Sequence, residues 1–165
     1  MKNIKTILIA VLSFMLLFSV SCKNEDKTGG GSGGSVDVPT ATRDPATDLT
    51  EIATYSGTVT RTVGEGPVDE LFGATMEVTL IILNNQITVS AGTGTIVEKG
   101  ILKSGSEYSA DGERSGEFSS KEYIKFTISG DSLEILEYTI GGSNPDGNSF
   151  KATFTGTLTK YTSGS

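Results

Sequence analysis

Apolar side chains recur at every second position in several short runs between residues 52 and 160, and Asn, Gly and Asp separate these runs. Successive side chains of a β-strand point to opposite faces of a sheet, so a period of two predicts half-buried strands. No helix longer than one turn is expected in this region. The chain is therefore restricted to an all-β domain, a single antiparallel meander of about eight short strands.

The clearest hairpin lies at residues 76–91, where two alternating apolar runs flank Asn84 and Asn85. A two-residue loop that contains Asn suits a type I′ turn, because Asn tolerates positive φ. With these residues as the turn, each inward apolar residue meets another, and a slip of one residue would lose this match. The predicted pairs are Leu83 with Gln86, Ile82 with Ile87, Leu80 with Val89, and Val78 with Ala91.

A second hairpin is predicted at residues 124–140, with its turn at Gly130 and Asp131. This register pairs apolar residues near the turn, but the apolar residues after residue 135 lie on the other parity. A β-bulge near residues 135–137 would switch the faces and bend the strand. The predicted pairs are Ile128 with Leu133 and Phe126 with Ile135, and the residues of changed parity are Leu136, Tyr138 and Ile140.

The first and last predicted strands carry nearly the same sequence: residues 55–62 read YSGTVTRT and residues 154–161 read FTGTLTKY. In an up-and-down barrel with an even strand number, the first and last strands are antiparallel neighbours. We therefore expect a closed barrel, with a β-sandwich as the alternative, and glycines where coiled strands bend. The predicted inner residues are Tyr55, Gly57, Val59 and Val63 on the first strand and Phe150, Ala152, Phe154, Gly156 and Leu158 on the last.

Residues 92–120 show a weaker pattern. Short strands are expected at residues 95–97, 100–108 and 113–118. Turns are expected at Gly105 and at Asp111-Gly112, because Gly and Asp favour turn conformations.

The N-terminus reads as a targeting signal. Lys2 and Lys5 precede an apolar run over residues 7–20, which is shorter than the ~20 residues that cross a bilayer. Residues 1–21 are therefore predicted to be a secretory signal. Its end, Ser19-Val20-Ser21-Cys22, resembles the lipobox of bacterial lipoproteins, which implies that Cys22 is lipidated and that the membrane is a partner. The alternative is ordinary cleavage, which would leave a soluble protein with a free Cys22.

Residues 22–50 form a predicted tether, because the stretch GGGSGGS and the prolines that follow it show no periodicity. Residues 51–162 are the predicted β domain. The acidic residues 23–26 resemble the surface-export tag of Bacteroidota lipoproteins, which implies an outer-membrane location exposed at the cell surface. The alternatives are a solvated charged run in the linker and an anchor on the periplasmic face.

The residue types exclude several functions. The chain has no His and a single Cys, so a Ser-His-Asp site and the usual zinc sites are impossible. A formal charge of −7 argues against nucleic acid as a partner. Glu65, Asp69 and Glu70 are interpreted as a solvated loop, and residues 142–148 as a turn rather than a calcium site. Arg61 is expected near the barrel mouth, where it reaches solvent; the alternatives are that it binds an anionic ligand or pairs with Glu137. No cofactor or metal is expected.

Residues 52–161 resemble the small lipocalin-like, or calycin-like, lipoprotein domains of Bacteroidota. The resemblance rests on the strand count, the aromatic-x-Gly opening of the first strand and the ending F-T-G-T-L-T-K. It implies a lipocalin-like barrel that binds a small apolar ligand.

The leading hypothesis is a monomeric, non-enzymatic surface lipoprotein that binds a small apolar ligand inside the barrel or a partner outside it. A barrel of about eight strands encloses room for side chains or for one small ligand. The second hypothesis is therefore a structural or adhesive surface protein with a packed core and no ligand pocket. An enzyme ranks last. The candidate ligand-binding residues of the barrel interior are Tyr55, Val59, Met76, Leu80, Phe126, Phe150 and Phe154.

Overall fold

The computed structural model describes residues 36–41, 43–50, 52–91, 95–114, 120–144 and 146–161, with no side-chain description for residues 95–99 and 114. The predicted signal, Cys22 and the acidic residues 23–26 lie outside these ranges. The elements are β1 (Asp44–Pro45), β2 (Ala53–Glu65), α2 (Val68–Leu71), β3 (Thr75–Leu83), β4 (Gln86–Ala91), β5 (Thr95–Gly100), β6 (Leu102–Ser104), β7 (Glu107–Arg114), β8 (Ser120–Ser129), β9 (Ser132–Ser143) and β10 (Ser149–Lys160).

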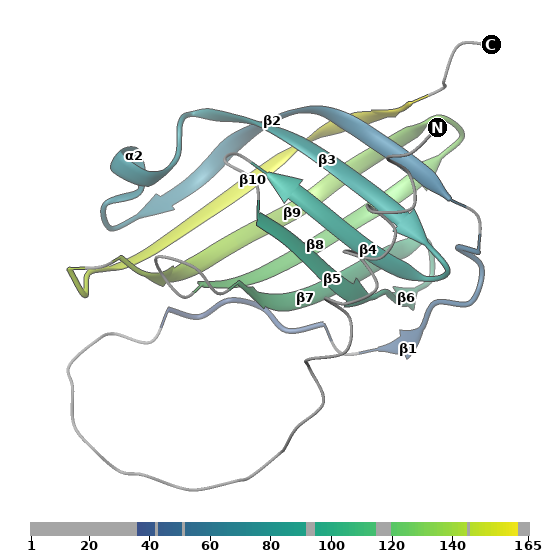
Figure 1. Ribbon diagram of the computed structural model, residues 1–165, viewed down its shortest axis with the longest axis horizontal. Coiled ribbons are helices and arrows are strands. Elements are labelled where there is room, and N and C mark those ends of the chain that lie inside the picture. The colour runs from purple at the N-terminus through teal and green to yellow at the C-terminus, as the bar shows by residue number, and fades with distance from the viewer. Residues whose placement is uncertain are drawn as a thin grey trace, which may run out of the picture. The chain divides into compact units, whose positions relative to one another are not determined.

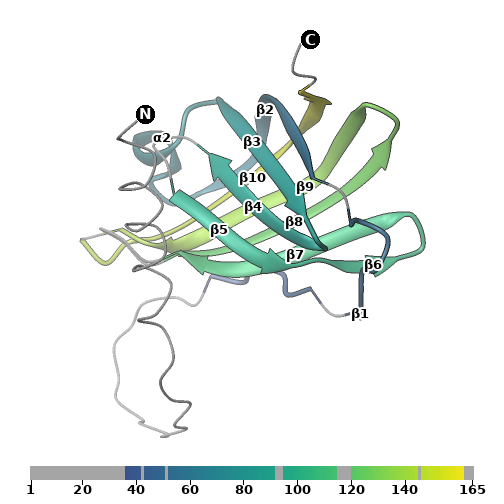
Figure 2. The same ribbon diagram turned by 45° about the vertical axis from the view of Figure 1, so that its right-hand side comes forward.

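The strands form one antiparallel sheet in the order β1-β6-β7-β8-β9-β10-β2-β3-β4-β5. The sheet curls strongly on itself, as two views of the ribbon show (Figures 1 and 2). Cα atoms of β5 and β7 come within 8 Å of each other, but no hydrogen-bonded ladder joins these strands. The all-β antiparallel meander is confirmed. The closed barrel is wrong, because the sheet is an open half-barrel.

The two strands with matching sequences, β2 and β10, are antiparallel neighbours as predicted. Their glycines let the backbones approach closely. A Cβ built on Gly57 would lie 2.9 Å from the carbonyl oxygen of Thr157, and one on Gly156 would lie 3.0 Å from that of Thr58. The register shifts beside Arg61, which leaves one extra residue in β2. This bulge turns Val63 outward to 43% exposure, so its predicted inward position is wrong.

Both predicted hairpins are confirmed. Asn84 and Asn85 have φ values of 50° and 58°, as a type I′ turn requires, and all four predicted β3–β4 pairs are present. In the second hairpin, both predicted β8–β9 pairs are present. The register shifts after Phe126, so Leu136 is the extra residue of the expected bulge. The extra residue reverses which side chains face inward, so Tyr138 and Ile140 lie in the core.

The region of weak pattern contains β5, β6 and β7. Gly105 lies in a turn with a φ of 60°, as predicted. Asp111 and Gly112 do not form a turn, because they pair with Tyr123 and Glu122 in the β7–β8 ladder. The predicted strand at residues 113–118 is described only to residue 114, where it belongs to β7.

Residues 36–50 run along the outside of the sheet and are called the strap. The predicted tether extended to residue 50, but β1 within the strap pairs with β6, and the amide of Ala46 donates to the carbonyl of Ile101 at 2.8 Å. Val36 and Val38 lie directly over Gly141 of β9. The strap therefore enters the domain beside the α2 end of the sheet and runs toward β1 (Figure 1).

The two ends of the curled sheet differ. The hairpin end carries the turns after β3, β6 and β8, together with the start of β2 and the end of β10. The loop end carries α2 and residues 144–148. Between them, the inner face is filled by large apolar side chains that are almost fully buried. These are Tyr138, Phe126, Phe150, Phe154, Leu80, Ile82, Ile87, Ile101, Leu133, Ile135, Ile140 and Leu158.

Candidate functional site

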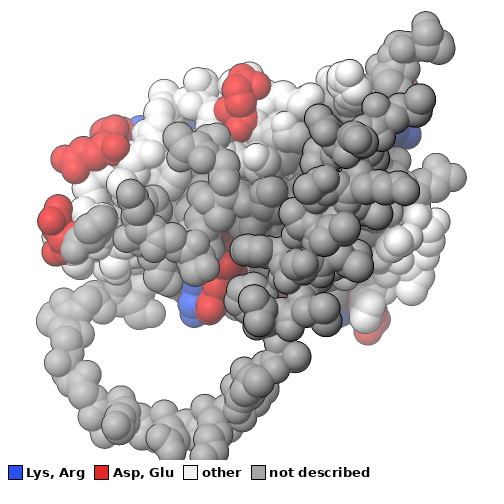
Figure 3. Space-filling model, in the orientation of Figure 1, with Lys and Arg blue, Asp and Glu red and all other residues white. Residues whose placement is uncertain are grey.

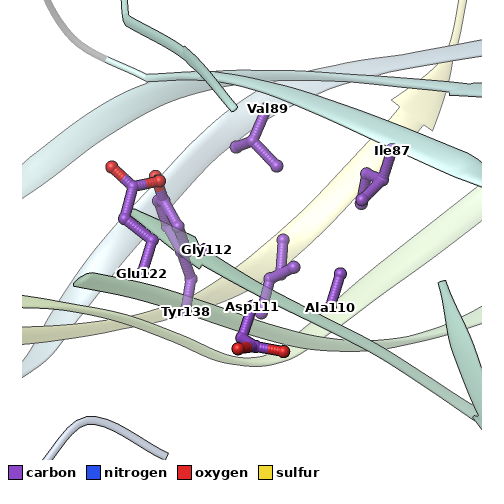
Figure 4. Close-up of a pocket in the computed structure, with 8 residues that line it drawn as sticks. Ile87, Val89, Ala110, Asp111, Gly112, Glu122 and Tyr138 are labelled. Carbon is purple, nitrogen blue, oxygen red and sulfur yellow. The ribbon is translucent and has the colours of Figure 1, made fainter. Parts of the chain in front are cut away.

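A cavity inside the half-barrel lies between β4 and the strands β7, β8 and β9. Its volume is about 10 Å³, which is roughly the room needed for one water. Ile87 and Val89 point into it from one side, and the Asp111 carboxylate points away from it (Figure 4). The lining residues are Ile87, Val89, Ala110, Asp111, Gly112, Glu122, Ile124 and Tyr138. The cavity is too small for an organic ligand.

Of the two acidic residues that line the cavity, Glu122 is the buried one. Glu122 is only 4% exposed, and the Tyr138 hydroxyl donates to its Oε2 at 3.0 Å. The two side chains lie side by side in Figure 4. A buried carboxyl group needs such hydrogen bonds, because burial without them costs free energy. Sequence reasoning missed Glu122, although it shares the inward parity of Ile124 and Phe126.

The seven predicted ligand-binding residues do not line this cavity. Six of them are buried in the core, and Met76 is partly buried against it. The phenylalanine rings in this set pack on other aromatic rings. Phe72, which follows α2, has its ring centroid 5.7 Å from that of Phe150 and 6.0 Å from that of Phe154. Phe72, Phe150 and Phe154 therefore fill the half-barrel at the loop end rather than leaving room there.

A larger hollow, called the cup, lies at the hairpin end. Its volume is about 240 Å³. Apolar side chains form most of its wall, and the strap supplies one side. Of the seven predicted ligand-binding residues, Tyr55 alone lines it. The lining residues are Asp48, Leu49, Thr50, Ala53, Tyr55, Ile82, Ile128 and Lys160.

Tyr55 and Lys160 are direct cross-strand partners on β2 and β10. Directly paired residues project from the same face of a sheet, with Cβ atoms about 5 Å apart. Tyr55 is 3% exposed, and within the described residues its hydroxyl has no hydrogen-bond partner. Burial raises the pKa of Tyr55, and the negative charge of Asp131 raises it further. The Lys160 ammonium has no acidic partner within 4 Å among those residues.

The other charged residue of the cup is already engaged. Asp48 forms an ion pair with Lys103 and accepts a hydrogen bond from the Tyr108 hydroxyl at 2.8 Å. These two hydrogen bonds, that of Lys103 first, hold the pKa of Asp48 below its usual value. The Lys103 ammonium also lies 5.1 Å from the centroid of the Tyr108 ring. Asp48 therefore fastens the strap to β6 and β7.

The remaining candidates are structural. Arg61 donates to the carbonyl of Phe72 at 3.0 Å and pairs with Asp69, so its predicted pairing with Glu137 is wrong. Within the described residues, no three His, Cys, Asp or Glu side chains gather as metal ligands would. In the loop at the end of β9, the amide of Asn148 donates to Oδ1 of Asn144 at 2.8 Å.

Among the described residues visible in Figure 3, basic side chains form no concentrated patch, and acidic side chains lie at several separate places. The helix found in the described residues is too short to cross a membrane. No family model, curated protein or solved structure matches this chain.

Proposed function

We propose that this chain is a lipid-anchored protein of the bacterial cell envelope whose half-barrel binds a small ligand in the cup and catalyses no reaction. The observation that carries this proposal is the mostly apolar wall of the cup, because the hollow of about 350 Å³ beside the strap is mostly polar and the interior cavity is small. The interior cavity holds about 10 Å³, whereas the cup holds about 240 Å³ and has mostly apolar walls. Concave, mostly apolar sites with a few polar groups are the usual form of small-molecule sites.

The placement of the cup supports this role. The strap begins at Val36 over Gly141 near the loop end, whereas the cup lies at the hairpin end. The described part of the chain therefore begins near the end opposite to the cup. Growth with a labelled fatty acid tests the anchor, and an unlabelled protein would contradict it. Protease treatment of intact cells tests surface exposure.

Exposed apolar side chains also gather at the hairpin end. Ile52 is 69% exposed, Leu83 41% and Tyr161 68%. The first precedes β2, the second ends β3 and the third follows β10, so all three lie near the mouth of the cup. Exposed apolar groups around a hollow are typical of binding surfaces.

The test is native mass spectrometry on the chain from residue 23 onward, which keeps every described residue. After incubation with lipid extract, native and denatured masses are compared. Added mass that disappears on denaturation supports the proposal. Ala53→Phe, which fills the cup, should abolish the added mass, whereas Ala74→Phe, at an exposed loop position, should leave it.

A second candidate is a structural or adhesive surface protein that acts through its exterior. The packed interior favours it, as do the hydroxyl residues on the outer faces of β2 and β10. Thr60 pairs with Thr155, and Ser56 pairs with Thr159. No added mass in any ligand mixture, together with retention of the protein on cell-surface polymers, would favour this candidate.

A further inference from the structure

The cup combines an apolar wall with two hydrogen-bond donors on one face. Tyr55 and Lys160 are opposite each other on paired strands, and both line the cup. We infer that the cup selects a small apolar monocarboxylate, whose carboxylate lies between the Tyr55 hydroxyl and the Lys160 ammonium. This inference rests on the proposed function, because it names the ligand class of the same site.

The two polar groups require an acceptor. An ammonium carries donors only, and a phenol donates readily to a charged oxygen. Tyr55 is almost fully buried, yet its hydroxyl has no partner in the described part of the chain. Its oxygen is not one of the fully buried, unpartnered atoms of the described residues, so it borders the open cup, where a ligand oxygen can accept its hydrogen bond. A carboxylate supplies two acceptor oxygens and the charge opposite to that of Lys160.

The charge of the cup disfavours the other ligand classes. Asp48 is the acidic residue of the lining, and Lys103 and Tyr108 already occupy its carboxylate. An amine would therefore meet the Lys160 ammonium inside the cup, whereas Asp131, whose negative charge acts on Tyr55, lies outside the lining. A neutral apolar ligand would cover Lys160 without pairing it, and a covered, unpaired charge is costly.

The size of the cup limits the apolar part of the ligand. A volume of about 240 Å³ is about 24 times that of the interior cavity, which has room for about one water. This room suits a chain of medium length or a single aromatic ring. Leu49, Ala53, Ile82 and Ile128 supply the apolar wall.

The test uses octanoate, octanol and octylamine, which share one chain and differ in the head group. Each is titrated by calorimetry, below its aggregation concentration, into the chain from residue 23 onward. We expect octanoate to bind about tenfold more tightly than octanol, because a charged hydrogen bond adds to the shared apolar contact. Octylamine should bind most weakly.

Three variants locate the head group. Lys160→Met should remove the preference for octanoate while octanol still binds, and Lys160→Glu should transfer the preference to octylamine. Tyr55→Phe should weaken octanoate several-fold and leave octanol unchanged. Lys151→Met is the matched control, because Lys151 lies on the same strand but not in the cup, and it should change nothing.

The outcomes separate this inference from the proposed function. Equal binding of octanoate and octanol overturns the inference, as does an equal loss in Lys160→Met and Lys151→Met. If octanoate does not bind but Ala53→Phe still abolishes capture of another mass, the inference fails and the proposed function stands. If Ala53→Phe leaves all captured mass in place, the proposed function fails as well.

Discussion

The curled sheet brings distant segments together at two joins, and only one of them closes. At the first join, β2 and β10 form an antiparallel ladder that contains one bulge. At the second join, β5 and β7 approach within 8 Å between Cα atoms, yet no ladder forms. Two neighbouring strands therefore form a ladder only where their backbone N–H and C=O groups point toward each other, and proximity alone is not enough.

At the hairpin end of the second join, backbone groups have other partners. Ile101 links β5 directly to β6, its amide donates to the carbonyl of Asn85, and its carbonyl accepts from the strap. β6 pairs with the first half of β7 only. The strap then bridges the gap, since Leu49 bonds with the β3–β4 turn and Asp48 with the opposite edge.

The largest expected effect comes from crowding the closed join. Gly57→Ala places a Cβ 2.9 Å from the carbonyl oxygen of Thr157, so the strands must shift. We expect the free energy of unfolding to fall by about 2 kcal/mol, as measured by urea denaturation. Gly100→Ala at the open join is the matched control, because nothing lies within 4 Å of its added Cβ. Equal losses would show that the two joins do not differ in packing.

The open join is tested next through the buried pair beside it. Tyr138→Phe removes the hydroxyl that donates to Glu122 at 3.0 Å, and both residues are buried. We expect the free energy of unfolding to fall by roughly 1–2 kcal/mol, because a buried acceptor loses a donor. Tyr161→Phe is the control, since Tyr161 is 68% exposed. An unchanged unfolding curve for Tyr138→Phe would mean that water reaches Glu122 and replaces the lost donor.

The closed join was predictable from the sequence, because the patterns that indicate it lie within single strands and turns. The period of two and the two matching segments place β2 beside β10, and Asn84 with Asn85 set the register of the next hairpin. The open join was not predictable in this way. It depends on single residues such as Ile101, whose partners come from the strap and from another turn. Residues 44–50 show no periodicity in the sequence. They are held on the sheet more by backbone hydrogen bonds than by buried apolar side chains.

The same distinction applies to the cup. Tyr55 was predicted as an inward residue, because alternation along one strand is enough to place it. Lys160 shares the parity of Leu158, yet a lysine at a strand end gives no signal until the register sets it opposite Tyr55. Asp48 lay in the predicted tether, so its contact with Tyr108 required the folded structure.

A smaller effect is expected from loosening the bridge across the open join. Asn85→Gly keeps a residue that accepts the φ of 58° but removes the Oδ1 atom that accepts from the amide of Leu49 at 2.9 Å. The free energy of unfolding should fall by about 1 kcal/mol or less. The Leu49 amide should exchange faster with solvent, while the β8–β9 amides should not. Uniform acceleration would mean that the strap does not open separately.

The smallest effect concerns the ion pair that holds the strap. Hydrogen bonds from Lys103 and Tyr108 lower the pKa of Asp48 from 3.8. The link is therefore complete above that pH and is lost as the pH falls through the lowered value. The hydrogen bond to Asp48 raises the pKa of Lys103 above 10.5. On the alkaline side the link is therefore complete below pH 10.5 and is lost as the pH rises through the raised pKa. The pair is partly exposed, so solvent screening limits its contribution to stability.

This last prediction is checked by following the backbone amide of Leu49 by NMR during an acid titration. A step below the usual pKa of an aspartate should appear in the native chain and disappear in Asp48→Asn, in which residue 48 no longer titrates. Asp146→Asn, in the exposed loop before β10, is the control and should keep the step. If the step survives in Asp48→Asn, another group holds the strap. The bridge across the open join would then rest on the Asn85 contact and the β1–β6 pairing alone.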